Sequence, residues 1–327
     1  MTLRIGLLGA SRVATFAVLA AAKDVPGVTV TAVAARDPAR AQVYADQHAI
    51  PQVHDDYEAL IAASDVDAVY NGLPPNLHAH WSIAALDAGK PVLCEKPFAL
   101  TMADVDAMLD AEARSGVLLM EAQHSHYHPL SARMRAVVRA RLFGKLTRVS
   151  AHFSTEVADN GLELRYLPDV GGGALWDLGV YPAYWIRSAT GEEPQVLSAT
   201  QCLHASGADI ATRAELRLAN GAPVNLHCDM AAPFSAAIRF EGTRGSLDIV
   251  NPLAPHSTKG HRFALTIDGV TREEHFDGPT TYAAQLAAFR DAVAHGAPVP
   301  TRGADTRATM ALLTAIAAQA RTQAHAD

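Results

Sequence analysis

The chain has few cysteines and no long hydrophobic segment, and both absences exclude classes of protein. Only Cys94, Cys202 and Cys228 occur, they stand far apart, and none forms a CxxC pair. This pattern argues against a disulfide framework or a thiolate zinc site and is typical of a reducing compartment. The apolar stretch from Val13 to Ala22 is too short to span a bilayer. We therefore expect a cytoplasmic protein without a signal peptide.

Clusters of basic residues are absent as well. The 327 residues carry a formal net charge of -7, and no block of lysine and arginine stands out. Neither a nucleic acid nor an anionic membrane surface is therefore favoured as a partner. With 49% hydrophobic residues, a chain of this length can bury a large core, and we expect two domains that act on small molecules.

Two hydrophobic patterns divide the sequence. In the first part, short β-branched runs such as LRIGLLG alternate with helical stretches rich in alanine, which predicts a doubly wound parallel sheet. From about residue 144, longer alternating segments separated by turn sequences predict a largely antiparallel sheet. The last part has helical periodicity and is expected to pack back on either domain. We place a dinucleotide-binding domain at 1–122 and a substrate-binding and oligomerisation domain at 123–327.

The loop after the first predicted strand, GLLGASRVA, has features of a phosphate-binding turn. A dinucleotide site needs small residues where the strand turns into a helix, because the pyrophosphate must approach backbone N–H groups closely. Here the pattern is Gly9-x-Ser11-x-x-Ala14, with serine at the place of the usual second glycine. A tight turn without a ligand would look similar, but the position at the first strand of a βαβ unit favours a dinucleotide site.

Arg36 and Asp37 follow the second predicted strand, where this type of domain recognises the adenosine ribose. An acidic residue there favours NAD, whereas an arginine favours the 2'-phosphate of NADP. Because Arg36 comes first, we predict NADP(H), with NAD(H) as the alternative that Asp37 keeps open. A solvated Arg-Asp-Pro turn is a further interpretation.

The segment PVLCEKPFAL places two charges, Glu95 and Lys96, directly after an apolar strand. Ligands of an open parallel sheet bind beyond the carboxyl ends of its strands, and Gly9, Arg36 and the GLPPNLH loop are expected at the same edge. A lysine held there by the following proline can hydrogen-bond a substrate hydroxyl and stabilise the negative charge that develops during hydride transfer. A surface ion pair is the simpler alternative.

Six motifs together resemble those of the Gfo/Idh/MocA oxidoreductases, most of all their dihydrodiol and sugar dehydrogenase branch. These motifs are GLLGASRVA, AARDPARA, GLPPNLHAHW, ALDAGKPVLCEKP, LLMEA and GGGALWDLGVYPAYW. The resemblance covers the whole chain. It implies a Rossmann domain followed by an α/β domain with an open-faced, mostly antiparallel sheet, and a homodimer or homotetramer that covers the open face. It also implies that Lys96 is the active-site lysine and that Glu95 and Pro97 shape the nicotinamide end of the site.

The segment GGGALWDLGVYPAYW supplies the second set of chemical groups. Three glycines, at 171–173, precede a predicted helix on which Asp177 and Tyr181, four residues apart, share a face. A tyrosine, with a pKa of about 10, can exchange a hydroxyl proton when a neighbouring ammonium such as that of Lys96 favours its ionised form. We predict Lys96, Asp177 and Tyr181 as catalytic residues, with Asp177 orienting Lys96 or the substrate. A buried helix with a core tyrosine is the alternative.

The segment QHSHYHP departs from the pattern of the resembled family, which commonly has aromatic residues and an arginine there. His126 stands at the usual arginine position and is predicted to line the substrate pocket. In an extended conformation His124, His126 and His128 would project from one face and could hold a zinc ion. No carboxylate partner is evident and nicotinamide chemistry needs no metal, so we predict none. Tyr166 and Trp176 are further substrate candidates, because aromatic rings stack on sugars.

The sequence therefore predicts an NADP(H)-dependent oxidoreductase that transfers a hydride between nicotinamide C4 and a ring alcohol or ketone of a sugar, polyol or dihydrodiol. The alternative is a dinucleotide-binding sensor or regulatory protein without turnover. The residues predicted to bind the cofactor are Gly9, Ser11, Arg12, Val13, Arg36, Leu73, Pro74, His78, Glu95, Lys96 and Gln123.

Overall fold

A computed structural model describes residues 2–161 and 163–323, and the chain divides into two compact units. Unit 1 comprises Met1–His124 and Pro279–Arg307, and unit 2 comprises Ser125–Gly278 and Ala308–Asp327. The chain thus leaves unit 1, forms most of unit 2 and returns. The roles expected for the two domains remain predictions.

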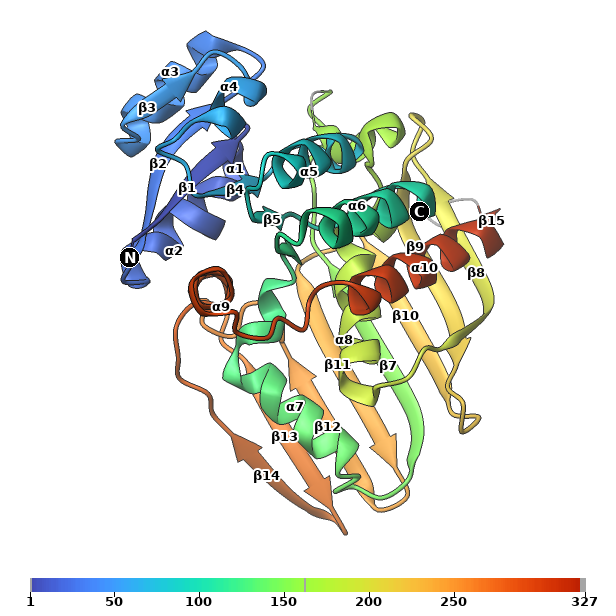
Figure 1. Cartoon of the computed structure of the whole chain (residues 1–327). Helices are drawn as coiled ribbons and strands as arrows, with labels where there is room; N and C mark the ends of the chain where they lie inside the picture. The colour runs from blue at the N-terminus through green and yellow to red at the C-terminus, as the bar shows by residue number, and fades with distance from the viewer. Residues whose placement is uncertain (1, 162, 324–327) are drawn as a thin grey trace. The chain divides into compact units, whose positions relative to one another are not determined.

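The sheet of unit 1 consists of parallel strands in the order β3-β2-β1-β4-β5-β6 (Figure 1). Its strands are β1 (Leu3–Leu8), β2 (Val28–Ala34), β3 (Gln52–His54), β4 (Ala68–Asn71), β5 (Val92–Cys94) and β6 (Leu119–Glu121). The order confirms the predicted doubly wound Rossmann sheet and places the topological switch point between β1 and β4. The short strand β3 was not predicted.

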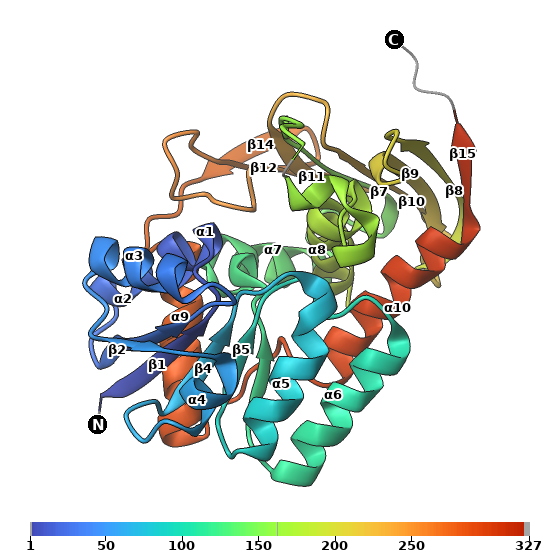
Figure 2. The ribbon, with the colours of Figure 1, turned by 90° about the horizontal axis from the view of Figure 1, so that it is seen from above.

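Helices connect these strands and cover the sheet (Figures 1 and 2). They are α1 (Arg12–Ala14), the π-helical turn η1 (Thr15–Ala20), α2 (Ala21–Asp24), α3 (Pro38–His48), α4 (Tyr57–Ala62), η2 (Pro75–Leu77), α5 (His78–Asp87), α6 (Met102–Ser115) and α9 (Thr281–His295). The Thr101 side chain caps the start of α6, and Gly116 in the left-handed region ends it. Helix α9 packs on η1 and α2 and buries Leu286 and Phe289 completely, so this late segment completes the core of unit 1.

Unit 2 contains a sheet in the order β14-β13-β12-β11-β7-β10-β9-β8-β15. Its strands are β7 (Leu146–Ser154), β8 (Gln195–Leu203), β9 (Asp209–Arg217), β10 (Pro223–Asp229), β11 (Ser235–Gly242), β12 (Gly245–Val250), β13 (Arg262–Ile267), β14 (Val270–Glu274) and β15 (Ala320–Gln323). Most pairs are antiparallel, as predicted, but β7 pairs with β10 and β8 with β15 in parallel. Because these partners lie far apart in the sequence, local turn signals did not indicate them.

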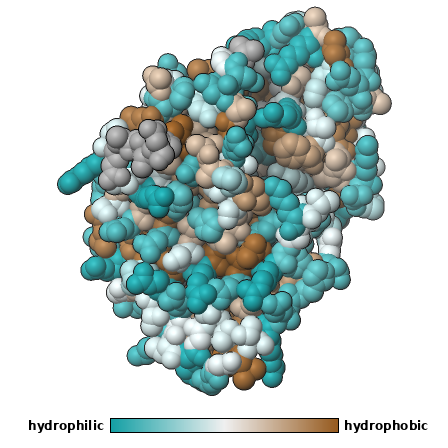
Figure 3. All heavy atoms as spheres, turned by 180° about the vertical axis from the view of Figure 1, so that it is seen from behind, coloured by the Kyte–Doolittle hydropathy of each residue, from teal (hydrophilic) through white to brown (hydrophobic). Residues whose placement is uncertain are grey.

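One face of this second sheet is covered by helices and the other is open (Figure 2). The helical elements of this part are η3 (His124–Tyr127), α7 (Pro129–Arg139), η4 (Leu164–Tyr166), η5 (Pro168–Val170), η6 (Leu175–Gly179), α8 (Val180–Thr190) and α10 (Ala304–Gln319). Helix α8 packs on β7 and β10, above the buried side chains of Val149 and Phe153, whereas Asn225 and Arg239 on the opposite face are exposed. This confirms the open-faced sheet. Figure 3 shows hydrophilic and hydrophobic side chains interspersed on that side.

Within residues 2–161 and 163–323, none of the helices combines the length and the apolar composition that crossing a membrane requires.

Candidate functional site

The predicted cofactor residues of unit 1 follow the carboxyl ends of its parallel strands. Gly9 follows β1, Arg36 follows β2, Leu73 follows β4 and Lys96 follows β5. Since the carboxyl ends of parallel strands meet at one edge of a sheet, the fold brings these residues to the edge where such sheets bind ligands.

The turn after β1 directs the start of a helix to this edge. Ser11 is the N-cap of α1, and its hydroxyl accepts a hydrogen bond from the Ala14 N–H at 3.3 Å. Gly9 has a φ of 92°, which a residue with a side chain rarely adopts. The helix then continues through η1 and α2, so its free N–H groups and dipole favour an anion at the turn that holds the predicted Arg12 and Val13.

The loop after β4 lies directly against this turn. A Cβ atom on Gly72 would stand 2.9 Å from Ser11 Oγ and 2.6 Å from Tyr70 Cε1, so only glycine fits between them. The loop continues with Leu73 and Pro74, which the sequence predicts as cofactor residues. The two loops that flank the switch point therefore lie in contact, at the position where sheets of this type bind dinucleotides.

At the end of β2, the carboxylate of Asp37 is used by the fold itself. It caps α3 by accepting hydrogen bonds from the N–H groups of Ala39 at 3.0 Å and Arg40 at 3.4 Å. Burial raises the pKa of the Tyr57 hydroxyl, and the nearby Arg36 partly offsets this rise. Arg40 was not predicted as a site residue, yet its guanidinium donates to the Ala10 carbonyl in the turn after β1 at 3.0 Å. The end of β2 thus presents two arginines.

His78, a predicted cofactor residue, lies buried between two loops. Its Nδ1 lies 2.9 Å from the Pro97 carbonyl and its Nε2 lies 2.8 Å from the Leu73 carbonyl. Burial lowers its pKa. Because its two ring nitrogens contact main-chain carbonyls of different loops, His78 connects the loop after β4 to the loop that carries Lys96.

Two buried carboxylates stand at the ends of β5 and β6. Glu95 accepts a hydrogen bond from the Tyr70 hydroxyl at 2.8 Å, and Glu121 accepts one from Gln123 Nε2 at 3.2 Å. Glu95 is 6% exposed, and Glu121 and Gln123 are fully buried. Glu121 and Tyr70 were not predicted as site residues, because on strands of three or four residues they resemble ordinary strand ends.

In unit 2, the predicted catalytic Asp177 has an arginine partner that the sequence did not reveal. Arg165 Nε donates to Asp177 Oδ2 at 2.5 Å, and Arg165 Nη1 donates to Glu163 Oε1 at 3.0 Å. The pKa of Arg165 is raised, mainly by the charge of Asp177. Asp177 lies in the π-helical turn η6 and Tyr181 in α8, so the regular α-helical face predicted for this pair is interrupted.

The Tyr181 ring is 5% exposed and packs edge-on against Phe153, with ring centroids 5.6 Å apart. Among the predicted substrate residues, Trp176 is half-buried. The Tyr166 hydroxyl donates to the Val157 carbonyl at 2.7 Å, so the polar end of that side chain is already used.

The histidine segment is not extended, and the geometry considered for a zinc site is wrong. His124–Tyr127 forms the 3-10 helix η3, in which alternate side chains do not share a face. His124 bonds to Thr281 at 2.8 Å, and His128 caps α7 through the Leu130 N–H. Within 2–161 and 163–323, no group of three or more histidine, cysteine or acidic residues is placed to hold a metal.

His126 itself is held by Tyr184, whose hydroxyl lies 2.6 Å from His126 Nδ1. Burial, followed by the charges of Arg135 and Arg139, lowers the pKa of His126 to about 3. The ring is therefore neutral at physiological pH. Arg135 Nη1, which can only donate, also lies 3.3 Å from Nδ1, so Nδ1 is an acceptor and the ring proton belongs on Nε2, which is then a hydrogen-bond donor.

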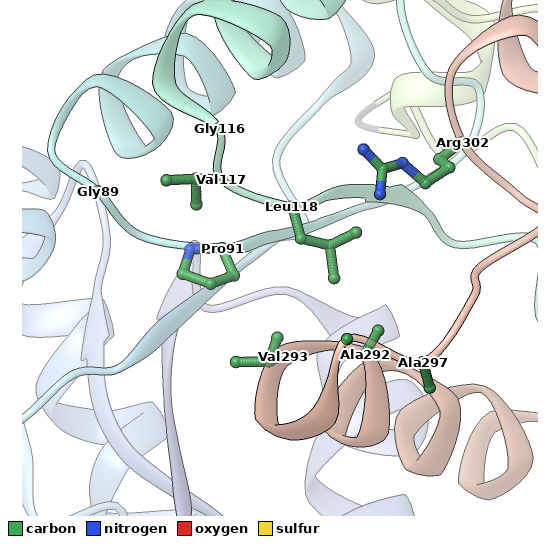
Figure 4. Close-up of a pocket in the computed structure, with 10 residues that line it drawn as sticks. Gly89, Pro91, Gly116, Val117, Leu118, Ala292, Val293, Ala297 and Arg302 are labelled. Atoms are coloured by element: carbon green, nitrogen blue, oxygen red, sulfur yellow. The ribbon is translucent and has the colours of Figure 1, made fainter.

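A cavity of about 380 Å³ lies in unit 1 at the opposite edge of the sheet (Figure 4). Pro91 and Leu118, which immediately precede β5 and β6, line it together with Val293 and Arg302. It is therefore distinct from the strand ends that carry Gly9 and Lys96.

Comparisons with known proteins agree with this geometry. Residues 3–123 match the model described as "Oxidoreductase family, NAD-binding Rossmann fold", and residues 131–248 match the "GFO/IDH/MocA C-terminal domain".

Individual relatives span most of the chain. A D-xylose 1-dehydrogenase (NADP(+)) of Haloferax volcanii is 34% identical over 81% of this chain and 81% of its own. A trans-1,2-dihydrobenzene-1,2-diol dehydrogenase of Sus scrofa is 33% identical over 68% of this chain and 66% of its own. The crystal structure of a 3-ketoreductase from Actinomadura kijaniata with NADP and TDP-benzene has a TM-score of 0.91, with 27% identity over 100% of both chains.

Proposed function

This chain belongs to the Gfo/Idh/MocA oxidoreductase family, and we propose that it is an NADP(H)-dependent dehydrogenase or reductase of a ring alcohol or ketone in a sugar, polyol or dihydrodiol. The observation that carries the proposal is the convergence of Gly9, Arg36 and Lys96 at one edge of the Rossmann sheet. The named relatives are dehydrogenases and reductases, so we favour turnover over the sensor alternative.

The residues of unit 1 fit a dinucleotide. The helix start at Ser11 suits the pyrophosphate, because free N–H groups and the helix dipole favour an anion there. The arginines at 36 and 40 suit the 2'-phosphate, since guanidinium groups bind phosphate oxygens through paired, charge-assisted hydrogen bonds. Asp37 argues less strongly for NAD(H), because its Oδ1 caps α3. We therefore assign NADP(H), with NAD(H) as the weaker cofactor.

A bound nicotinamide ring supplies the acceptor or donor of the hydride. When an alcohol is oxidised, its C–H bond breaks with loss of hydride, and the hydroxyl proton passes to the phenolate oxygen of ionised Tyr181, a form that the Lys96 ammonium favours. Lys96 hydrogen-bonds the reacting oxygen and stabilises the negative charge that develops on it. Asp177, held by Arg165, positions these groups. The reverse sequence reduces a ketone.

His126, Tyr166 and Trp176 are proposed to contact the substrate. His126 is a neutral ring with a proton on Nε2, which suits donation to a substrate hydroxyl or carbonyl oxygen. The half-buried Trp176 offers an apolar ring face on which a sugar can stack. Tyr166 contributes its ring, since its hydroxyl bonds to Val157.

The test is cofactor binding followed by turnover. The purified protein is titrated with NADPH and NADH by fluorescence, and sugars, polyols and dihydrodiols are then screened with NADP⁺. Lys96→Met and Tyr181→Phe are expected to retain NADPH binding and to lose at least about a hundredfold in kcat, because removing a donor that stabilises the developing charge, or a general acid or base, commonly costs that much. Full activity in both variants would contradict the assigned roles. Binding without turnover on any substrate of these classes would favour the sensor.

We further propose a cytoplasmic homodimer or homotetramer. The open sheet face of unit 2 supports the oligomer, since a second copy would cover it. Sedimentation of the purified protein decides the stoichiometry, and a monomer at all concentrations would exclude it.

A further inference from the structure

Tyr70 connects two strand ends within unit 1. It lies near the end of β4, is fully buried, and donates its hydroxyl hydrogen to Glu95 Oε1 at 2.8 Å. Burial and the neighbouring Glu95 raise its pKa well above the usual range. Tyr70 therefore stays protonated and acts as a hydrogen-bond donor.

The main chain fixes Glu95 from the other side. Its N–H donates to the Asn71 carbonyl at 3.0 Å, and its Oε2 accepts from the Lys96 N–H at 3.3 Å. Both carboxylate oxygens therefore have partners, and the carboxylate has a defined orientation beside the predicted active-site lysine.

A second carboxylate adds to the negative charge at this edge. Glu121 ends β6, where it pairs in register with Cys94, the residue before Glu95. Burial raises the pKa of the Cys94 thiol, and both Glu95 and Glu121 contribute to the rise. The register of β5 and β6 thus brings a second buried carboxylate to the strand next to the one that Glu95 follows.

We propose that Tyr70 is a positioning residue that orients the Glu95 carboxylate at the nicotinamide end of the sheet edge, so that unit 1 binds the oxidised cofactor, whose nicotinamide ring is positively charged, in preference to the reduced cofactor, whose ring is neutral. The inference rests on the proposed function in that it takes NADP(H) as the cofactor. A carboxylate in a region of low dielectric attracts a cation strongly, whereas its effect on a neutral ring is small. Loss of the Tyr70 hydroxyl removes a charge-assisted hydrogen bond and so disfavours the ionised carboxylate.

The experiment compares the dissociation constants of NADP⁺ and NADPH in wild type and in Tyr70→Phe. This substitution removes only the hydroxyl and keeps the buried ring. We expect NADP⁺ to bind about tenfold more weakly, because a Glu95 side chain without its Tyr70 partner no longer presents its charge to the nicotinamide ring, while NADPH affinity stays within about twofold. A purely structural role of Tyr70 would change both affinities by the same factor.

Tyr44→Phe is the matched control. The Tyr44 hydroxyl donates to the Ser11 carbonyl at 3.0 Å, beneath the phosphate turn that serves both redox forms. Its removal is expected to change both affinities equally.

Equal changes for the two redox forms in Tyr70→Phe would overturn the proposal. If Tyr70→Phe does not fold, Glu95→Gln decides, because it removes the charge and keeps the shape. If Glu95→Gln leaves the ratio of NADP⁺ to NADPH affinity unchanged, the proposal is likewise overturned. Failure to bind either redox form would refute this inference together with the cofactor assignment. If the wild-type protein binds both redox forms but turns over no substrate, only the proposed reaction is refuted. The inference about Tyr70 stands in that case, because the affinity ratio is measured without substrate.

Discussion

At the scale of single residues, the carboxylate of Asp37 decides how the end of β2 is interpreted. The sequence places an arginine and an aspartate side by side, and each favours a different cofactor. In the fold, Asp37 caps α3, and Arg40 reaches back to Ala10. Asp37 Oδ1 and Arg40 thus both have partners within the fold, which leaves Arg36 as the residue that we propose recognises the 2'-phosphate.

Arg36→Ala is expected to weaken NADPH binding about tenfold to a hundredfold and to leave NADH within about twofold, because only NADPH offers a phosphate to the lost guanidinium. Fluorescence titration with both cofactors measures the difference. Asp37→Asn is the control, since an asparagine caps the helix equally well. Equal losses for NADPH and NADH in Arg36→Ala would refute the assignment.

The sequence predicted residues at strand ends but not their partners. Gly9, Arg36 and Lys96 could be predicted because the strand pattern and the topology of parallel sheets place them at one edge. The pairs Arg165–Asp177 and Tyr70–Glu95 could not, since each joins residues whose approach depends on the packed structure. The packing of the folded chain determines which donor bonds to a buried carboxylate, and no local sequence pattern encodes that packing.

At the scale of elements, the glycine loop before α8 depends on close backbone contact. A Cβ atom on Gly172 would stand 2.6 Å from the Leu164 carbonyl oxygen and 2.7 Å from that of Arg165. The loop thus lies against the segment whose arginine holds Asp177. Glycine here serves the approach of two backbones.

Gly172→Ala is expected to lower the melting temperature by roughly 3 to 10 °C, because overpacking costs about 1–3 kcal/mol. It should also lower kcat by displacing Arg165. Gly278→Ala is the control, since its Cβ would meet Pro129 at an ordinary 3.6 Å. Thermal unfolding followed by circular dichroism measures both variants. A melting temperature of Gly172→Ala equal to that of the control would show that the loop can move aside.

The strands that the sequence did not predict lack a clear apolar pattern. Strand β3 is partly exposed along its length, unlike the equally short but fully buried β5 that the sequence did predict, and β15 follows directly on the helix α10. The QHSHYHP segment forms η3 where an extended segment was considered, because the partners that fix His124 and His128 lie elsewhere in the fold. The long apolar strands and helices were predicted because their periodicity reflects burial.

At the scale of the whole molecule, the two units are interleaved in the sequence. Unit 1 needs Pro279–Arg307, which supplies α9 and Thr301. The Glu121 N–H donates to the Thr301 carbonyl at 2.9 Å, and the Thr301 hydroxyl donates to the Glu121 carbonyl at the same distance. The edge strand of unit 1 is therefore held by residues from near the other end of the chain.

A fragment of residues 1–124 is expected to be less stable than the same fragment joined to 279–307 by a flexible linker. Without α9, the surface that buries Leu286 and Phe289 is exposed, at a cost of about 3–6 kcal/mol. Urea unfolding followed by circular dichroism compares the two proteins. Identical, cooperative transitions would mean that α9 is dispensable.

The interleaving also has a consequence for synthesis. A ribosome makes the strands of the Rossmann sheet first, yet the helix that completes their core is translated only after all of 125–278. At about 5–20 residues per second, this delay is on the order of ten seconds. Synthesis of unit 1 begins first, but its core is completed late. During this delay, the apolar surface that α9 later covers is exposed on the nascent chain and is available to chaperones.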